Sequence, residues 1–422
     1  MSPTIGFYGD DFTGSIDALL QYRRTGLRGV VFTDPAEIAA ADLSGWDVVG
    51  IAGVGRGLPV AELAGEVLPA LRALAALAPR LVQYKACSTA DSSPEIGSLG
   101  RAIELGRQVL GEHPVAVLLA QPDFGRYTVF GTHFAADGDR IHRLDRHPTM
   151  TTHPVTPIGE ADLTRHLGAQ TDLPIGSLPF TSYDRSEAEQ SRLLGDRTGG
   201  EQIVVMDALD DRHLVAAGRA ILGQPQRPVF GLGSGGLSRA VGLALTGTPV
   251  ELGDTAQPAP GPVLVVSGSA SRRTWQQVED AVGHGWQPVD VLAEPTPWQL
   301  AAAVFTAGRS VVAYTSAPGG RHEPDGERIA DRLARTVSEV AAAGGLTRLV
   351  VAGGDTSGRV LRRLGVTAIE ILATPWGNAA LCRAIGAASC IDGVELVLKG
   401  GQMGGTGLFE SIRTGGADGA GR

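Results

Sequence analysis

Residues 4–20 read TIGFYGDDFTGSIDALL, and this stretch decides the fold. Residues 4–8 form the short apolar run of a buried strand, which ends at Gly9 and the two aspartates Asp10 and Asp11. The apolar positions that follow are spaced as on one face of a helix, so a helix should begin directly after the aspartates. A strand that turns at once into a helix is the repeating unit of α/β proteins, whose ligands bind at the carboxyl ends of the strands.

The same alternation recurs outward from this stretch. We expect strands at residues 48–51, 81–85, 115–120, 203–206 and 229–232, and helices at 60–77, 99–110, 160–170 and 211–222. Residues 251–262 are rich in Pro, Gly, Ala and Asp and read as a linker. After them the pattern restarts, with strands expected at 263–266, 310–314, 349–352, 368–372 and 396–398 and helices at 274–282 and 326–342.

The sequence therefore predicts two α/β domains with mostly parallel sheets and an active site in the cleft between them. Residues 1–250 form the first domain, 251–262 the linker and 263–422 the second domain. A length of 422 residues fits two domains of ordinary size. Residues 121–157 lack clear periodicity, and a long structureless segment inside a compact domain is usually functional.

Composition and charge argue against several classes of function. The 36 basic and 45 acidic residues give a formal net charge of −9, which argues against a nucleic-acid partner. Three scattered cysteines support neither a disulfide framework nor a zinc site. No apolar run approaches the ~20 residues that cross a bilayer, and the first residues do not read as a signal peptide. We therefore expect a soluble cytoplasmic protein with small-molecule ligands and no membrane partner, as a monomer or a homo-oligomer.

Two interpretations fit Asp10 and Asp11. As adjacent carboxylates at a strand end, they could bind Mg²⁺, accept a proton or hold substrate hydroxyls. As structural groups, Asp11 or Thr13 would cap the helix that follows. The doubled aspartate favours function, because like charges side by side are costly without a partner.

Lys85 begins a second polar set at a strand end. It supplies a cation, and Ser88 and Ser92 supply hydroxyls, a combination that suits a carboxylate with neighbouring hydroxyl groups. The alternative is a serine-rich turn in which Asp91 or Ser92 caps the next helix. Placement at a strand end favours the binding interpretation.

Cationic side chains gather in the aperiodic segment 121–157. Arg126, Arg143, His147 and His153 are candidates to hold a carboxylate or a phosphoryl group, because arginine binds such groups with two parallel hydrogen bonds. The alternative is a salt-bridged surface loop. The histidine spacing matches no standard zinc pattern, so no metal site built from protein side chains is predicted.

Three glycine-containing turns follow strands in the second half of the chain. Such turns present backbone N–H groups to an anion at the start of a helix, so together they predict one nucleotide site. Neither a Walker A motif nor a dinucleotide-binding fingerprint is present. The candidate nucleotide-binding residues are Ser269, Ser271, Gly353, Gly354, Asp355, Thr356, Lys399 and Gly400.

These motifs, in this order, resemble the four-carbon acid sugar kinase family over nearly the whole chain. The matching segments are GDDFTG at 9–14, KACS at 85–88 with Asp91, HPVTPI at 153–158, VSGSAS at 266–271, AGGDTSG at 352–358 and LKGGQMG at 398–404. The chain departs from the family pattern at Gly9, where the family has Ala. It departs again at GDT (354–356) for GET and at KGGQMG (399–404) for KSGNFG. PEIGSLGR at 94–101 and FGRY at 124–127 resemble a branch apart from the 3-oxo-tetronate kinases, with a branched acid such as 3-oxo-isoapionate as substrate.

The resemblance implies an N-terminal domain that binds an acid sugar and a C-terminal domain that binds ATP and gives up its γ-phosphate. It places ATP contacts near Ser269, Gly353 to Thr356, and Gly400, with Mg²⁺ arriving with the nucleotide. Since phosphoryl transfer depends on positioning and charge neutralisation, we expect Lys85, Arg126 and Arg143 to hold the substrate carboxylate or to steady the phosphoryl group. Asp10 or Asp11 would orient or deprotonate the attacking hydroxyl. The alternative is a non-catalytic, two-lobed sensor of sugar acids.

Overall fold

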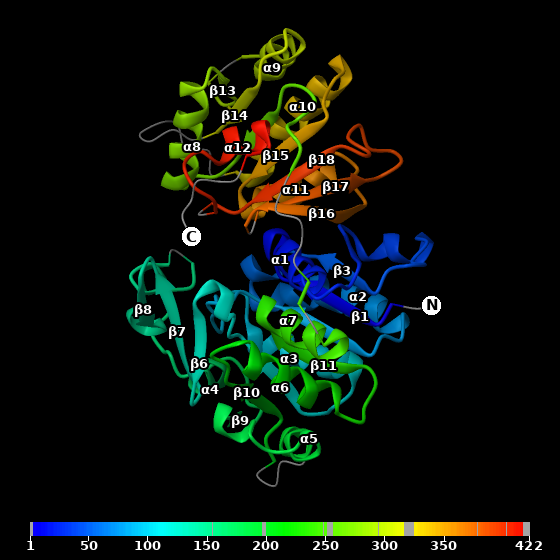
Figure 1. The fold of residues 1–422 in the computed structure, drawn as a ribbon, viewed down its shortest axis with the longest axis vertical. Coiled ribbons are helices and arrows are strands. Elements are labelled where there is room, and N and C mark those ends of the chain that lie inside the picture. Colours follow the sequence, from blue (N-terminus) through cyan, green and yellow to red (C-terminus); the bar gives the residue numbers. More distant parts are fainter. Residues whose placement is uncertain are drawn as a thin grey trace. The chain divides into compact units, whose positions relative to one another are not determined.

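The computed structural model describes residues 3–153, 155–195, 200–247, 249–250, 256–293, 295–315, 325–377, 379–401 and 403–416, and only the backbone of Asp355. The chain divides into two compact units (Figure 1). Unit 1 comprises residues 1–29 and 34–250, and unit 2 comprises residues 30–33 and 251–422. Residues 251–255 of the expected linker lie outside the described residues.

Unit 1 is built on a parallel sheet with the strand order β3-β1-β4-β11-β5-β10-β9. Its strands are β1 (Ile5–Gly9), β3 (Val48–Ala52), β4 (Leu81–Lys85), β5 (Val115–Leu118), β9 (Ile175–Leu178), β10 (Ile203–Met206) and β11 (Val229–Gly233). Gly9 lies opposite both Ala52 and Lys85 in the register, so β1, β3 and β4 end side by side. The residues that follow these strands are therefore brought to one edge of the sheet.

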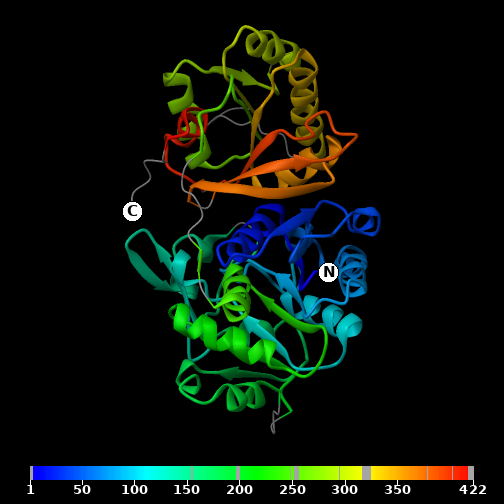
Figure 2. The ribbon, with the colours of Figure 1, turned by 45° about the vertical axis from the view of Figure 1, so that its right-hand side comes forward.

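Helices cover both faces of this sheet, which is why its strands are apolar runs and do not alternate with polar residues. One layer contains α1 (Phe12–Arg23), α5 (Glu187–Gly195), α6 (Asp211–Leu222) and α7 (Gly235–Thr246). The other contains α2 (Val60–Ala76), α3 (Leu99–Leu110) and α4 (Leu163–Gly168) (Figure 2). The 3-10 helices are η1 (Pro35–Ala40), η2 (Gly55–Gly57), η3 (Pro122–Phe124), η4 (Leu144–Arg146), η5 (Met150–Thr152) and η6 (Phe180–Ser182).

The aperiodic segment contains a three-stranded antiparallel sheet, which the sequence did not predict. We call it the arm; it consists of β6 (Arg126–Val129), β7 (Thr132–Asp137) and β8 (Arg140–Arg143). Its strands are short and only partly buried, so they lack the continuous apolar runs of the main sheet. Asp207 anchors the β6–β7 turn by accepting hydrogen bonds from the N–H groups of Phe130 and Gly131 at 2.7 and 3.0 Å.

Unit 2 has a mixed sheet with the strand order β13-β14-β12-β15-β18-β17-β16-β2. The first five strands are parallel and the last three pairings are antiparallel. The strands are β2 (Gly29–Phe32), β12 (Leu264–Ser267), β13 (Gln287–Asp290), β14 (Val311–Tyr314), β15 (Arg348–Ala352), β16 (Ala368–Trp376), β17 (Ala379–Ile385) and β18 (Glu395–Lys399). The helices are α8 (Arg272–Gly283), α9 (Pro297–Thr306), α10 (Gly326–Ala343), α11 (Gly354–Arg363) and α12 (Leu408–Thr414).

Strand β2 joins unit 2 although it lies near the start of the chain. Val30 lies opposite Glu370, and the hydroxyl of Thr33 donates to the carbonyl of Val366 at 2.7 Å. The division predicted from the sequence kept residues 30–33 in the first domain, because a four-residue apolar strand carries no sign of the sheet that it joins.

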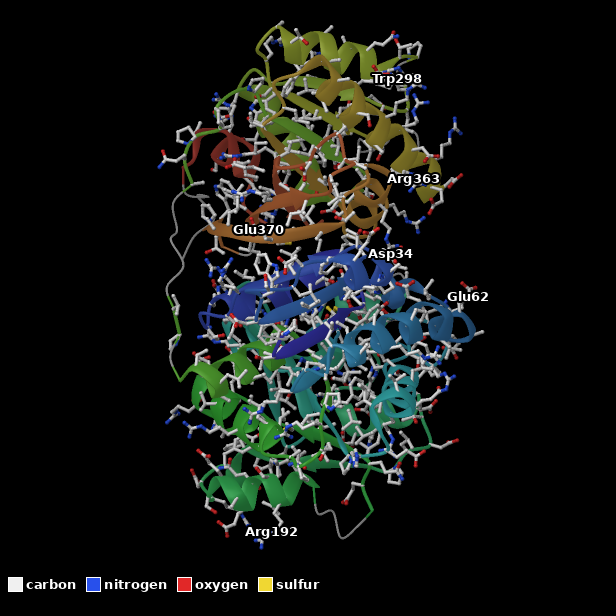
Figure 3. All side chains as sticks on the ribbon, turned by 90° about the vertical axis from the view of Figure 1, so that its right-hand side faces the viewer. Asp34, Glu62, Arg192, Trp298, Arg363 and Glu370 are labelled. Carbon is white, nitrogen blue, oxygen red and sulfur yellow. The ribbon has the colours of Figure 1, made fainter. Side chains whose placement is uncertain are left out.

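Each unit has its own apolar interior and a charged surface. Glu62, Arg192 and Arg363 are examples of exposed charged side chains (Figure 3). Arg348 and Lys399 are buried charged side chains of unit 2. Arg348 forms an ion pair with Glu395 at 2.6 Å and donates to the carbonyl of Ile412. Among the described residues, no helix is both long and apolar enough to cross a membrane.

Candidate functional site

Asp10 and Asp11 lie at the edge of the unit 1 sheet where β1 ends, as the sequence predicted. Asp11 caps α1, because its Oδ1 accepts the N–H of Gly14 at 2.8 Å and its Oδ2 accepts the hydroxyl of Thr13 at 2.9 Å. Asp10 makes neither of these contacts and is almost completely buried. The capping interpretation therefore holds for Asp11, while Asp10 does not cap the helix.

Arg56 is the partner that the two adjacent carboxylates require, and the sequence analysis did not identify it. Its Nη2 lies 2.7 Å from Asp10 Oδ1 and 2.9 Å from Asp11 Oδ1, and its Nη1 lies 2.9 Å from Asp11 Oδ2. The residue belongs to η2, directly after β3. A sequence signal was available, since GVGRG at 53–57 follows a buried strand just as GDDFTG does.

Lys85 adds a second cation to this edge. Its ammonium group lies 3.4 Å from a carboxylate oxygen of Asp17 in α1 and donates to the carbonyl of Ala86 at 3.0 Å. A Cβ atom on Gly14 would lie 3.3 Å from Lys85 Nζ and 2.2 Å from Asp11 Oδ1. The glycine therefore allows the helix start, the lysine and the aspartate to approach closely.

The two aspartates differ in acidity. Burial raises the pKa of Asp10 above its ordinary value, and the charge of Asp11 adds to the rise, although Arg56 opposes both. Burial also tends to raise the pKa of Asp11, but Arg56 and Lys85 outweigh it and leave that pKa below its ordinary value. A pair of carboxylates with separated pKa values assigns proton uptake to the member with the higher one, which here is Asp10.

Ser88 and Ser92 lie in the loop at 86–93 that follows Lys85. The hydroxyl of Ser92 is occupied within the protein, since it contacts the carbonyl of Ala90, the ring of His166 and the amide of Gln170. Ser88 is held through its carbonyl, which lies 2.8 Å from His133 Nε2. Burial raises the pKa of the Cys87 thiol to about 11, so this cysteine is not an activated nucleophile.

Arg126 begins β6 of the arm and lies near the 86–93 loop. Its Nη1 donates to the carbonyl of Phe124 at 2.6 Å, whereas its Nε is buried and has no hydrogen-bond partner. Burial lowers the pKa of Arg126 from its ordinary value, and Cys87 and Asp91 act in the opposite direction. A buried guanidinium nitrogen without a partner is costly, which fits a group that meets an anionic ligand.

The other cationic candidates lie farther along the arm and beyond it. Arg143 is half exposed and paired with Asp145, with 2.6 Å between its Nε and Oδ1. His147 accepts the N–H groups of Thr149 and Met150 at Nδ1. His153 accepts the N–H of Thr156 in the same way. All three therefore have partners within their own segment, as the surface-loop alternative expects.

Three turns meet at the carboxyl edge of the parallel strands in unit 2, as predicted. The hydroxyl of Ser271 donates to the carbonyl of Gly401 at 2.7 Å, and the hydroxyl of Thr274 contacts Ser269 Oγ at 3.1 Å. Gly353 adopts a φ of +122° and donates its N–H to the carbonyl of Lys399. The turns after β12, β15 and β18 therefore form one surface of backbone groups and hydroxyls.

Glycines are required where these turns approach each other. A Cβ atom on Gly268 would lie 2.4 Å from the Thr356 hydroxyl, and one on Gly353 would lie 3.0 Å from it. Gly354 begins α11, and Gly400 donates its N–H to the sulfur of Met403. The arrangement suits the phosphates of a nucleotide, which bind to N–H groups at the starts of helices. The Asp355 side chain lies outside the described part of the chain.

Lys399 is buried beneath these turns. Its Nζ donates to the Thr274 hydroxyl at 2.7 Å and to the carbonyls of Gly400 and Gly401 at 2.9 and 3.2 Å. Burial, together with the charge of Arg273, lowers the pKa of Lys399 to about 7. Three partners use all three hydrogens of an ammonium group, so Lys399 holds the turns together.

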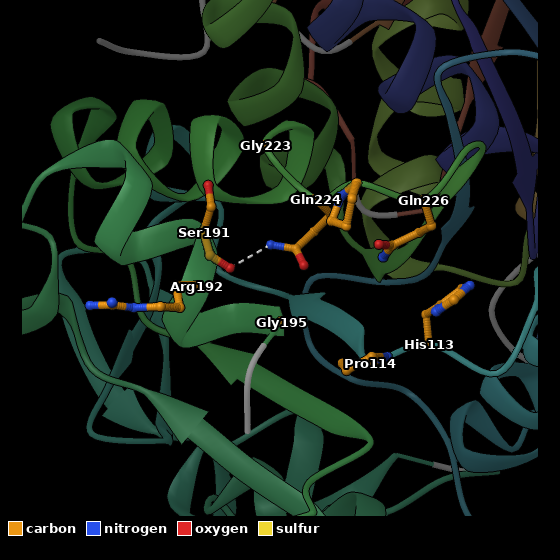
Figure 4. A pocket seen from close by; sticks show the side chains of 9 residues that line it. His113, Pro114, Ser191, Arg192, Gly195, Gly223, Gln224 and Gln226 are labelled. Atoms are coloured by element: carbon orange, nitrogen blue, oxygen red, sulfur yellow. Dashed lines mark hydrogen bonds between the residues drawn. The ribbon is translucent and has the colours of Figure 1, made fainter. Parts of the chain in front are cut away.

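Among the described residues, no group of three or more His, Cys, Asp or Glu side chains is placed to hold a metal ion. A separate hollow of about 370 Å³ lies at the opposite edge of the unit 1 sheet, between Pro114, Ser191 and Gln224 (Figure 4). It contains none of the candidate residues. The candidate catalytic and binding residues therefore lie at the carboxyl ends of the strands in the two units.

The comparisons with known proteins identify the two domains. Residues 5–241 match the model of a sugar-binding N-terminal domain, and residues 264–409 match that of a nucleotide-binding C-terminal domain. A 3-oxo-isoapionate kinase of Paraburkholderia graminis is 35% identical, with 99% of this chain and 95% of that protein covered. A 3-oxo-tetronate kinase of Cupriavidus necator is 32% identical, with 97% and 96% covered.

A solved structure supports the same assignment at the level of the fold. A Salmonella typhimurium protein aligns with a TM-score of 0.78 at 27% identity, covering 96% of this chain and 98% of that one. Apart from residues 30–33, the two family models fall on the two units that the fold separates, and the kinases match along nearly the full length. The chain belongs to the four-carbon acid sugar kinase family, in which a sugar-binding N-terminal domain is joined to a nucleotide-binding C-terminal domain.

Proposed function

We propose that this enzyme transfers the γ-phosphate of ATP to a hydroxyl of a small 3-oxo acid sugar, with branched 3-oxo-isoapionate as its preferred substrate. The observation that carries the proposal is the set of two buried carboxylates, one buried ammonium and one partly exposed guanidinium at the edge of unit 1. The substrate preference is supported by the 35% identity to a 3-oxo-isoapionate kinase over 99% of the chain.

Asp10 is the proton acceptor in this proposal. It takes the proton of the attacking hydroxyl, whose oxygen forms a bond to the γ-phosphorus while the bond from that phosphorus to the bridging oxygen breaks. ADP leaves with the bonding electrons, and the proton passes from Asp10 to water. Asp11 has a structural role, since it accepts hydrogen bonds from Arg56 and from the Gly14 N–H at the start of α1.

Lys85 and Arg126 hold the substrate carboxylate. Lys85 is a buried cation at the same edge as Asp10, and Arg126 has a buried Nε free for an acceptor. Ser269, Ser271, Gly353, Gly354, Thr356 and Gly400 bind the ATP phosphates, and Lys399 supports them from beneath. Mg²⁺ bound to ATP would neutralise charge on the phosphates and would need at most one or two protein ligands.

A screen for ADP release tests the proposal. Erythronate, threonate, their 3-oxo forms and 3-oxo-isoapionate are each supplied with MgATP, and the Asp10→Asn variant serves as the matched control. We expect 3-oxo-isoapionate to give the highest kcat/KM and the variant to lose the signal. If an acid sugar binds by calorimetry but none releases ADP, the chain is a sensor and the kinase proposal is wrong.

A further inference from the structure

The loop at 86–93 is held in a strained conformation. Ala90 has a φ of +55°, in the left-handed region that residues with a side chain seldom adopt. Its N–H donates to the carbonyl of Cys87 at 3.1 Å, which closes a tight turn. Strain of this kind persists only where the surroundings fix the chain. The loop directly follows Lys85, so the conformation of the loop determines which groups surround the Lys85 ammonium.

His133 of β7 fixes the first half of this loop. The side chain is completely buried, with its Nε2 2.8 Å from the carbonyl oxygen of Ser88 and its Nδ1 2.9 Å from the hydroxyl of Thr128. A carbonyl oxygen only accepts, so Nε2 must carry the hydrogen and Nδ1 must accept from Thr128. The Ser88 carbonyl therefore fixes the ring form, and Thr128 stabilises that form by donating to Nδ1.

His166 of α4 fixes the second half. Its Nε2 lies 2.9 Å from the Ser92 hydroxyl and 3.1 Å from the Gln170 amide nitrogen. The Ser92 hydroxyl also donates to the carbonyl of Ala90, the strained residue. Imidazole rings from outside the loop, those of His133 and His166, therefore form hydrogen bonds to it on both sides of Ala90.

Both rings are suited to act as neutral hydrogen-bonding groups. Burial, with smaller contributions from the charges of Arg126 and His166, lowers the pKa of His133 to about 4, although the hydrogen bond to Ser88 opposes the shift. Burial also lowers the pKa of His166 from its ordinary value. At neutral pH neither ring adds charge beside Lys85 and Arg126. The histidines hold the loop without competing for an anionic substrate.

We propose that His133, with its ring form stabilised by Thr128, is a positioning residue for the acid-sugar site: it holds the 86–93 loop in its strained conformation and thereby places the surroundings of Lys85. This inference rests on the proposed function for its kinetic consequences. Its structural part, the restraint of the loop, stands independently of any activity. The arm thus serves to fix the loop as well as to carry Arg126.

Three variants test the kinetic part. His133→Leu removes the bond to Ser88 and should raise KM for the acid sugar about 10-fold, the size of effect expected from losing a buried hydrogen bond. KM for ATP should stay within twofold. In His133→Gln, an amide nitrogen can donate to Ser88 and should restore most of the loss. Thr128→Val keeps the volume of the side chain but removes the hydroxyl, and should give an intermediate effect.

Hydrogen exchange tests the structural part without relying on activity. In His133→Leu, the backbone amides of residues 86–93 should exchange at least 10-fold faster than in the unaltered protein. The matched control is Gln190→Leu, which removes two hydrogen bonds from a buried side chain to the carbonyls of Tyr183 and Arg185, away from the loop. The control should lower the melting temperature without accelerating exchange in the loop.

The outcomes separate the two proposals. Faster exchange in the loop of an enzyme that phosphorylates no acid sugar would overturn the proposed function and leave the restraint in place. Unchanged exchange at 86–93, or equal KM values in His133→Leu and His133→Gln, would overturn the positioning role. A loss of melting temperature alone, with unchanged kinetics, would reduce His133 to a packing residue.

Discussion

Two lysines end strands in the two units, and their surroundings differ. Lys85 is the last residue of β4 and Lys399 the last of β18, and each donates to the carbonyl of the residue after it. Lys85 also lies 3.4 Å from the carboxylate of Asp17. Lys399 instead contacts a hydroxyl and a second carbonyl, and burial lowers its pKa to about 7.

The difference shows how one kind of sheet edge is adapted to two ligands. The edge of unit 1 is built from paired charges, with Arg56 between Asp10 and Asp11 and Lys85 beside them. In such a set a carboxylate can accept a proton and the cations can bind an anionic sugar. The edge of unit 2 offers hydroxyls and the start of α11 at Gly354, above a lysine whose ammonium group donates to backbone carbonyls. This suits phosphate groups that bring their own charge and cation.

The largest effect is expected from Asp10→Asn, which removes the charge of the proton acceptor and keeps its volume. Since general bases contribute about 10²–10⁴-fold, kcat should fall by that factor. ATP affinity, measured by calorimetry, should change by no more than a few-fold because unit 2 is untouched. A larger loss of ATP binding than of acid-sugar binding would mean that the two edges have been assigned the wrong way round.

Gly268→Val should have the opposite pattern at the other edge. Its Cβ would lie 2.4 Å from the Thr356 hydroxyl, so the turns must separate and the phosphate surface is lost. We expect KM for ATP to rise at least 10-fold while calorimetric binding of the acid sugar survives. Gly283→Ala is the matched control, because a Cβ at that position of unit 2 meets no atom within 4 Å. Equal kinetics in the two variants would argue against the nucleotide surface.

Lys85→Met and Arg143→Ala should separate the cations of unit 1. Lys85 is buried at the edge, so its loss should raise KM for the acid sugar about 10-fold. Arg143 is half exposed and already paired with Asp145, and a surface pair of this kind contributes little, so its loss should change KM by less than threefold. A large effect of Arg143→Ala on KM for the acid sugar alone would return it to the binding site.

The sequence predicted what depends on local pattern and did not predict what depends on distant partners. The aspartates after β1 and the glycine turns of unit 2 follow from strands that end at a sheet edge, and the structure brings each set together. The motif GVGRG at 53–57 marks Arg56 as a strand-end residue, but its contact with the two aspartates depends on the pairing of β1 with β3, which the local pattern does not show. The arm and the exchange of β2 were missed because short or half-buried strands carry a weak periodic signal.

The smallest expected effect is on the melting temperature. It should depend on pH in one range for His133 of unit 1 and in another range for Lys399 of unit 2. His133 has a pKa of about 4 in the folded protein against an ordinary value of 6.5, so below pH 6.5 the unfolded chain binds a proton that the folded chain does not. The stability that neutral His133 contributes is complete above pH 6.5 and is lost as the pH falls towards 4. The unaltered protein should therefore lose melting temperature faster than His133→Gln across this window.

Lys399 should act in the same direction in a different window. Its pKa is about 7 in the folded protein against an ordinary value of 10.5, so between these values the unfolded chain again binds the extra proton. Its contribution is complete above pH 10.5 and is lost as the pH falls towards 7. Relative to Lys399→Met, the unaltered protein should gain melting temperature as the pH rises from 7. A flat difference between these two proteins would mean that Lys399 keeps its charge when folded, as a lysine beside a carboxylate does, and the contrast between the two edges would then rest on glycines and aspartates alone.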